Sequence, residues 1–145
     1  MPSATYTHSA VAAQAIDVVW GRLQEAPTWS EIGPIDEVTD PVHVEGALQS
    51  FRWAATVGPS RYRATATVLR SDPPNLMRVR LDAGEVTGDL EARLEPDGDD
   101  HTAVHITLQI SSRGILSTMF FPAISQAVGQ GLPDQVAAFA ASFTP

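Results

Sequence analysis

The residues of this sequence that could do chemistry are four histidines and a set of hydroxyl side chains, because the chain has no cysteine and no lysine. The missing cysteine excludes disulfides and thiolate ligands or nucleophiles, and the missing lysine excludes Schiff bases. The H-E-x-x-H zinc motif, the G-x-S-x-G nucleophile motif and the phosphate-binding glycine loop are also missing. We therefore expect no metal site and no cofactor.

The histidines occupy different positions in the hydrophobic pattern. His101 lies in a polar turn and His105 on the outward phase of its strand, so both are expected at the surface. His8 shares a strand phase with Tyr6 and can face inward, whereas His43 lies in a stretch without a clear phase.

Composition limits the partners of the protein. The chain has 145 residues, is 43% hydrophobic and 18% charged, and carries a net charge of −8, which predicts one globular domain spanning 1–145. A domain this acidic repels phosphate backbones, so nucleic acid is an unexpected partner. No apolar run approaches the roughly 18 residues of a membrane span, and no secretory signal is evident, so the expected location is the cytoplasm.

Helical spacing follows a short first strand at Tyr6–Ser9. Apolar residues at i, i+3, i+4 and i+7 predict one helical face made of Ile16, Val19, Trp20 and Leu23. This helix lacks a good capping residue, Pro27 ends it, and a second short helix is expected at Trp29–Ile32.

From about Ile35 to Ile110 the pattern has a period of two, which predicts some six strands joined by short turns. Arginine and threonine side chains alternate with the apolar residues, so one face of this antiparallel sheet is wet and the other is covered. Helical spacing returns after Gly114, with an expected kink or short break around Gly129, Gly131 and Pro133. The predicted fold is α+β, with a curved antiparallel sheet wrapped around a long C-terminal helix and two short helices after the first strand.

The order of these elements and their motifs resembles the helix-grip (SRPBCC) superfamily. That superfamily includes START domains, birch-pollen-allergen-like proteins and bacterial polyketide cyclase/dehydrase-like proteins. The matching segments are Val19-Trp20-x-x-Leu23, Trp29, Gly46, Phe51-Arg52-Trp53, Val68–Leu76, Gly88, Leu94-Glu95-Pro96 and Asp97–Thr102. The resemblance covers nearly the whole chain and implies an apolar cavity between the sheet and the last helix.

The inward phase of the strands and the last helix supplies residues to line such a cavity. They are Phe51, Trp53, Tyr62, Val79, Leu90, Val104, Ile106, Met119, Phe120, Ala123, Ile124 and Ala127. Small residues on the same faces, at Ala55, Ala64, Ala66 and Ala92, would leave volume beside the aromatic rings. The alternative is a solid core in which the helix packs closer over the alanines.

Trp20 and Trp29 are expected in the core, whereas Trp53 and Tyr62 are better ligand contacts because each combines an apolar body with a polar edge. The Tyr62 hydroxyl can point into the cavity or reach water at its rim.

Two functions fit this pattern. The first is binding, by sequestration or transport, of a hydrophobic small molecule such as a lipid, polyketide or aromatic metabolite. The alternative is a polyketide cyclase, aromatase or dehydrase that uses the same cavity, with Tyr62 and His8 as candidate proton-transfer groups. A third, a fold that binds a partner through the outer face of the sheet, is disfavoured by the polar residues there. The oligomeric state stays open.

Overall fold

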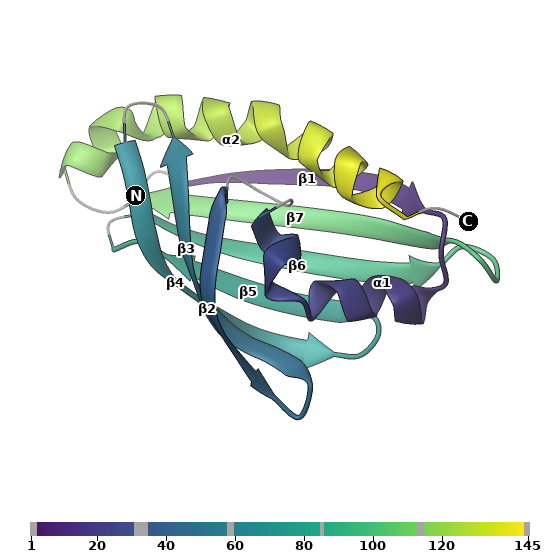
Figure 1. Ribbon diagram of the computed structural model, residues 1–145. Helices are drawn as coiled ribbons and strands as arrows, with labels where there is room; N and C mark the ends of the chain where they lie inside the picture. The colour runs from purple at the N-terminus through teal and green to yellow at the C-terminus, as the bar shows by residue number, and fades with distance from the viewer. Residues whose placement is uncertain (1–2, 31–34, 58–59, 85, 113–114, 144–145) are drawn as a thin grey trace.

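The computed structural model describes residues 3–30, 35–57, 60–84, 86–112 and 115–143 (Figure 1). The elements are β1 (Ser3–Ala12), α1 (Ile16–Leu23), the 3₁₀ helix η1 (Ala26–Ser30), β2 (Glu37–Val44), β3 (Ala47–Val57), β4 (Ser60–Asp72), β5 (Leu76–Asp82), β6 (Val86–Pro96), β7 (Thr102–Ser112) and α2 (Ile115–Ala141).

The strands form one antiparallel sheet of seven, in the order β1-β7-β6-β5-β4-β3-β2. Strands β2 to β7 lie side by side in chain order as an antiparallel meander. Strand β1, at the start of the chain, pairs with the last strand, β7. The predicted α+β helix-grip architecture is confirmed, with α2 arching over one face of the sheet (Figure 1). The first strand is longer than the expected Tyr6–Ser9 because it pairs with β7 from Ser3 to Ala12.

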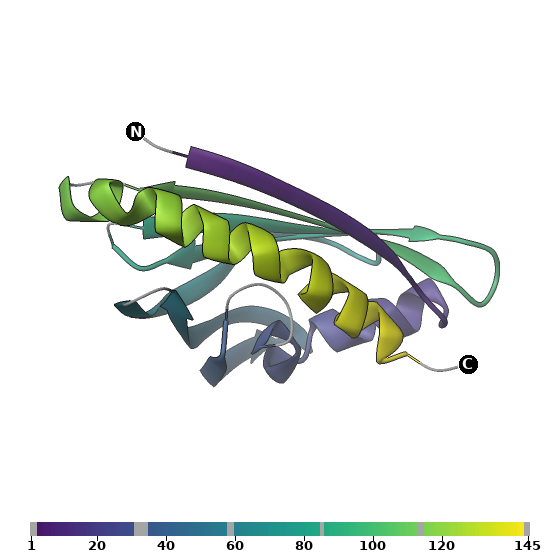
Figure 2. The ribbon, with the colours of Figure 1, turned by 90° about the horizontal axis from the view of Figure 1, so that it is seen from above.

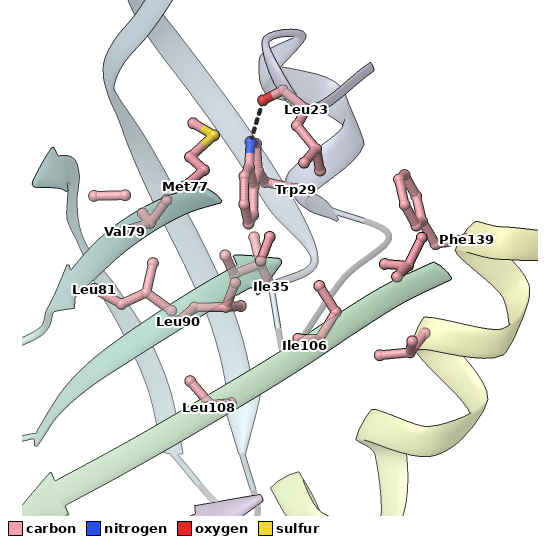
Figure 3. Packing of buried hydrophobic residues seen from close by; sticks show 14 of the residues in the cluster. Leu23, Trp29, Ile35, Met77, Val79, Leu81, Leu90, Ile106, Leu108 and Phe139 are labelled. Carbon is pink, nitrogen blue, oxygen red and sulfur yellow. Dashed lines mark hydrogen bonds between the residues drawn. The ribbon is translucent and has the colours of Figure 1, made fainter. Parts of the chain in front are cut away.

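Alternation along the strands separates a dry face from a wet one, as the period of two predicts. On β7, Val104, Ile106 and Leu108 are fully buried, while His105 and Thr107 between them remain partly accessible. The buried side chains point toward α1 and α2, so the core lies between the sheet and these helices (Figure 3).

The β2–β3 hairpin explains why the sequence around His43 has no clear phase. Its two turn residues, Glu45 and Gly46, have φ values of 53° and 83°, as a tight two-residue hairpin turn requires. The pairing register shifts between Thr39 and His43, and Asp40 also has a positive φ of 52°. These bulges interrupt the alternation that reveals the other strands.

The two short helices confirm part of the prediction and correct the rest. Val19 and Leu23 of α1 are fully buried, and Ala15 caps α1 without a side-chain hydrogen bond. The second short helix is a 3₁₀ helix at Ala26–Ser30, so the expected start at Trp29 was wrong, and the expected end at Ile32 lies outside the described part of the chain. Its single turn is shifted toward α1 because Thr28 N donates to Glu25 O at 3.0 Å.

Helix α2 runs from Ile115 to Ala141, so of the kink or short break expected near Gly129, Gly131 and Pro133, the break is absent. Figure 2 shows it as one continuous ribbon crossing the sheet beside β1. A proline can remain in a helix when neighbouring packing holds the backbone and the helix bends to relieve the ring. That packing is supplied by the buried residues of its carboxyl half, Leu132, Val136, Phe139 and Ala140.

Candidate functional site

The inner face of the sheet divides into a packed half and an accessible half. In the packed half, α1, η1 and the carboxyl half of α2 lie against the sheet (Figure 3). Residues from both sides of this contact are fully buried, among them Leu23 of α1, Trp29 of η1 and Leu94 of β6. Phe139 and Phe143 of the carboxyl-terminal segment meet edge to face there, with ring centroids 5.2 Å apart.

The accessible half lies at the other end of the sheet, next to the point where β7 leads into α2. Its inward-facing residues are Val38, Tyr62, Ala64, Ala83 and Val86, which keep part of their surface exposed, and the buried Trp53, which stands between Val38 and Ala64. Register places Val38 and Ala64 on either side of Trp53, and Val86 opposite Ser112. This group, here called the open band, therefore crosses the sheet as one continuous strip.

Helix α2 comes closest to β1, and its approach to β7 and β3 is less extensive. Figure 2 shows β1 running beside α2 along one side, while the central strands pass underneath. The middle of the sheet, where β4, β5 and β6 lie, is thus separated from α2 by side chains rather than by close backbone packing. A concave sheet with a helix at one side is a geometry that can hold a ligand.

The predicted lining residues fall on both halves. Phe51, Trp53, Val79, Leu90, Val104 and Ile106 are buried on the inner face, and Tyr62 is half-buried there. Val104 pairs with Leu94 in the packed half, whereas Trp53 pairs with Ala64 in the open band. The side chains of Met119, Phe120, Ala123, Ile124 and Ala127 lie outside the described residues.

The two buried tryptophans differ in hydrogen bonding. Trp29 is in the core, as expected: its indole Nε1 donates to Leu23 O at 3.0 Å (Figure 3). Its ring stacks on Phe51. Trp20 is partly buried and packs against the same core. Trp53 is 8% exposed, and its indole nitrogen is buried without a hydrogen-bond partner.

Tyr62 and His8, the candidate proton-transfer groups, both face the inner side but are not brought together. The row of paired residues through Ala66, Leu81, Gly88, Ile110 and Ala4 gives a common reference across the sheet. Tyr62 lies four residues to one side of this row and His8 four residues to the other. The described structure contains no hydrogen bond between them, so the geometry does not make them an acid–base pair.

Tyr6 is a residue whose role the sequence did not reveal. Its hydroxyl donates to Ser125 O on α2 at 2.8 Å and is also in contact with Ser125 Oγ. The ring covers Gly129, where a Cβ atom would lie 2.5 Å from Tyr6 Cε1. The glycine within a helical pattern was the available signal, since it marks a close approach of another group.

A serine, a histidine and a glutamate meet on the outer face of the sheet. Ser9 Oγ lies 2.6 Å from His105 Nδ1, and His105 Nε2 lies 3.7 Å from Glu95. The expected surface position of His105 is confirmed, since its ring lies on the wet face.

Metal ligands do not cluster in the described part of the chain, where no group of three His, Asp or Glu side chains could share an ion. His101 and His105 are four residues apart, but one lies in a turn and the other on a strand. That spacing brings two ligands together on a helix, not on extended chain.

The outer face also carries paired charges. Arg61 contacts Asp36 at 3.2 Å and Glu37 at 3.0 Å, and Arg80 contacts Asp89 at 3.1 Å. The hydrogen bond with Asp36 raises the pKa of Arg61, and the hydrogen bond with Asp89 raises that of Arg80. Because both pKa values are raised, the stabilisation from each charged guanidinium is present at neutral pH and is lost as the pH rises through its folded-state pKa, far above neutrality.

A separate hollow of about 820 Å³ opens on the surface between α1, η1 and the β2–β3 hairpin. Arg22, Glu25, Pro41 and Gly46 are among the residues around it. Within it, His43 Nε2 forms a hydrogen bond with Gln24 O at 2.8 Å, which connects the β2–β3 hairpin to the end of α1. The hollow is open to solvent, and the charged side chains of Arg22 and Glu25 stand at it beside the buried Ala26 and Thr28.

Solved structures of known proteins share this fold. The Zhui aromatase/cyclase from a Streptomyces species matches with a TM-score of 0.72 at 16% identity, over 97% of this chain and 94% of that one. Norcoclaurine synthase from Thalictrum flavum, solved with dopamine and hydroxybenzaldehyde, matches with a TM-score of 0.62 at 13% identity, over 99% and 90%. A START superfamily protein from Mycobacterium smegmatis gives 0.60 at 10% identity, over 90% and 97%.

The fold is therefore that of the START-like and polyketide-cyclase-like helix-grip proteins, as the sequence resemblance implied. No protein-family model matches the sequence, and no curated protein matches it. Among the described residues, no helix is long and apolar enough to cross a membrane.

Proposed function

We propose that this protein binds a hydrophobic small molecule between the open band of the sheet and α2. The observation that carries the proposal is the partial exposure of Ala64. This alanine faces inward from a central strand, with neighbours on both sides, yet part of its surface remains accessible. Ala66, two residues further along the same strand, is fully buried. We interpret the accessible part of Ala64 as apolar surface that a ligand could cover.

The side chains around this space favour an uncharged ligand. The inward residues around this space are apolar or aromatic, and the paired arginines project from the opposite face. A bare charge there would lose its hydration without a counter-charge, at a cost of several kcal/mol. The solved relatives include proteins whose names describe an aromatase/cyclase and a norcoclaurine synthase, which is consistent with a cavity that holds ring compounds.

Ala64→Leu and Thr65→Leu test this proposal as a matched pair. Both variants place a leucine on β4, one inward into the proposed space and one outward into water. The probe is N-phenyl-1-naphthylamine, an uncharged dye that fluoresces when it leaves water. We expect saturable binding of one dye per chain by the parent and by Thr65→Leu. Ala64→Leu should bind at least about tenfold more weakly, since the added side chain occupies the ligand volume.

A melting temperature for each variant serves as the control for folding. Equal dye affinity in the parent and both variants would contradict the proposed location. No saturable binding by the parent would contradict the proposed function itself.

A further inference from the structure

The indole nitrogen of Trp53 is a hydrogen-bond donor that the described structure leaves unused. The side chain is 8% exposed, and Nε1 is covered on all sides without an acceptor in reach. Leaving a buried donor unpaired destabilises the folded state, and native proteins rarely do so. Trp29, in the packed half, has its indole nitrogen bonded to Leu23 O.

The four residues directly next to Trp53 on the inner face of the sheet have no side-chain acceptor. Val38 on β2 and Ala64 on β4 stand directly opposite it, and Phe51 and Ala55 precede and follow it on the same face of β3. Backbone carbonyls on both sides of β3 are engaged in ladder pairing with β2 and β4. Tyr62 stands across from Ala55, but its hydroxyl makes no hydrogen bond to the indole.

We propose that the ligand brings the missing acceptor: an uncharged, apolar ring compound whose carbonyl or ether oxygen accepts a hydrogen bond from Trp53 Nε1. This inference rests on the proposed binding function and specifies the ligand class for the same site. Trp53 lies within the open band, between Val38 and Ala64, so a molecule that occupies the band lies against the indole. One hydrogen bond in an apolar site fixes the orientation of the ligand.

The shape of the site indicates a flat skeleton. Cross-strand pairing sets an alanine opposite each of the three rings: Ala66 opposite Phe51, Ala64 opposite Trp53 and Ala55 opposite Tyr62. Small residues next to aromatic edges favour a planar ring over a bulky branched chain, because ring faces pack at van der Waals distance over methyl groups.

Because Nε1 is covered, neighbouring side chains must move before a ligand can accept its hydrogen bond. The ligand-free protein therefore carries the cost of an unpaired donor, and the bound state regains it. A carbonyl group on a ligand loses its hydration when it enters the site. We expect the hydrogen bond to Trp53 Nε1 to outweigh that loss, so that the carbonyl improves binding.

Two probes of the same shape test the proposal: 2-acetylnaphthalene, which carries a carbonyl, and 2-ethylnaphthalene, which does not. Their dissociation constants are measured on the parent and on Trp53→Phe, which keeps an aromatic ring but removes the donor. We expect the ratio of the two constants to change by about five- to tenfold between parent and variant, the value of one hydrogen bond. Differences in probe hydration cancel in this ratio because both proteins see the same two probes.

Indole signals in a ¹⁵N–¹H spectrum of the unmodified protein give a second measurement that needs no variant to fold. The Trp53 Nε1–H resonance should shift downfield with 2-acetylnaphthalene and not with 2-ethylnaphthalene. The Trp29 resonance, already bonded to Leu23 O, should stay in place and serves as the internal control.

The outcomes separate the two proposals. If both probes bind but the ratio is the same in parent and variant, or the Trp53 resonance does not respond to the ketone, the acceptor inference is wrong and the binding function stands. If neither probe binds the parent, the binding function fails and the inference fails with it.

Discussion

Trp29 and Trp53 are both buried, but only Trp29 has a partner for its indole nitrogen. A hydrogen bond contributes about 1 kcal/mol when it is made, and a buried donor or acceptor left alone costs 1–3 kcal/mol. The two residues therefore differ in what their replacement by phenylalanine should do, although the same atoms are removed.

We expect Trp29→Phe to lower the free energy of unfolding by about 2–4 kcal/mol, because it creates a cavity and strands the carbonyl of Leu23. Trp53→Phe should cost at least about 1 kcal/mol less, since it removes an unpaired donor together with the lost volume. Urea denaturation of both variants measures the difference. Equal losses would show that the Trp53 nitrogen is paired in solution.

For single residues, the sequence predicted on which face of the sheet a side chain lies, but not which hydrogen bonds it makes. The period of two correctly placed Trp53 and Tyr62 on the inner face, because alternation follows directly from strand geometry. Whether an indole nitrogen finds an acceptor depends on what stands across from it in space. The bond from Tyr6 to Ser125 joins residues 119 positions apart, a separation that local patterning does not reach.

At the scale of elements, the unbroken course of α2 depends on its contact with β1. Tyr6 lies over Gly129 so closely that a Cβ atom there would fall 2.5 Å from its ring. Glycine at this position allows α2 to lie close to β1, and the helix continues through the glycine. The sequence indicated a break because glycine and proline weaken an isolated helix, whereas tertiary packing decides in the folded chain.

Gly129→Ala and Gly131→Ala form a matched pair for this contact. Alanine favours a helix over glycine by about 1 kcal/mol, so Gly131→Ala, whose nearest neighbour would lie at 3.6 Å, should stabilise the protein by up to that amount. Gly129→Ala should instead lower the free energy of unfolding by about 1 kcal/mol, because overlap with Tyr6 outweighs the propensity gain. Thermal melts of both variants measure this, and stabilisation by both would contradict the contact.

The other elements show where sequence patterns succeed. Each central strand has one wet face and one dry face, so alternation identified β3 to β7 and their order. The 3₁₀ helix at Ala26–Ser30 was misplaced because a single turn has no periodicity to detect, and proline fits either its start or the end of α1. Strand β2 was hard to phase because its bulges break the alternation.

Across the whole molecule, stability is concentrated at one end. The packed half holds fully buried residues from α1, η1, β6, β7 and the carboxyl half of α2. The edge strand β2 pairs only with β3, contains register shifts and exposes Val42 and Val44. Local opening is expected where buried contacts are few.

Hydrogen exchange should follow this division. Amides of β6, β7 and the segment around Val136 and Phe139 should exchange only through global unfolding. Amides of β2 should exchange at least about a hundredfold faster, through local opening of the edge. Residue-resolved exchange by NMR measures both sets in one experiment, and protection of β2 equal to that of β7 would contradict the division.

Because the inner face is divided, substitutions in its packed half and in its open band have different effects. The side chains that hold the fold together and those offered to a ligand lie at opposite ends of the same sheet. Substitutions at Val38, Ala64 or Val86 alter the shape of the open band without removing a fully buried contact. The protein can therefore acquire a different ligand preference by small steps while its melting temperature stays nearly constant. This makes the open band a natural place to vary residues when new binders are sought from this scaffold.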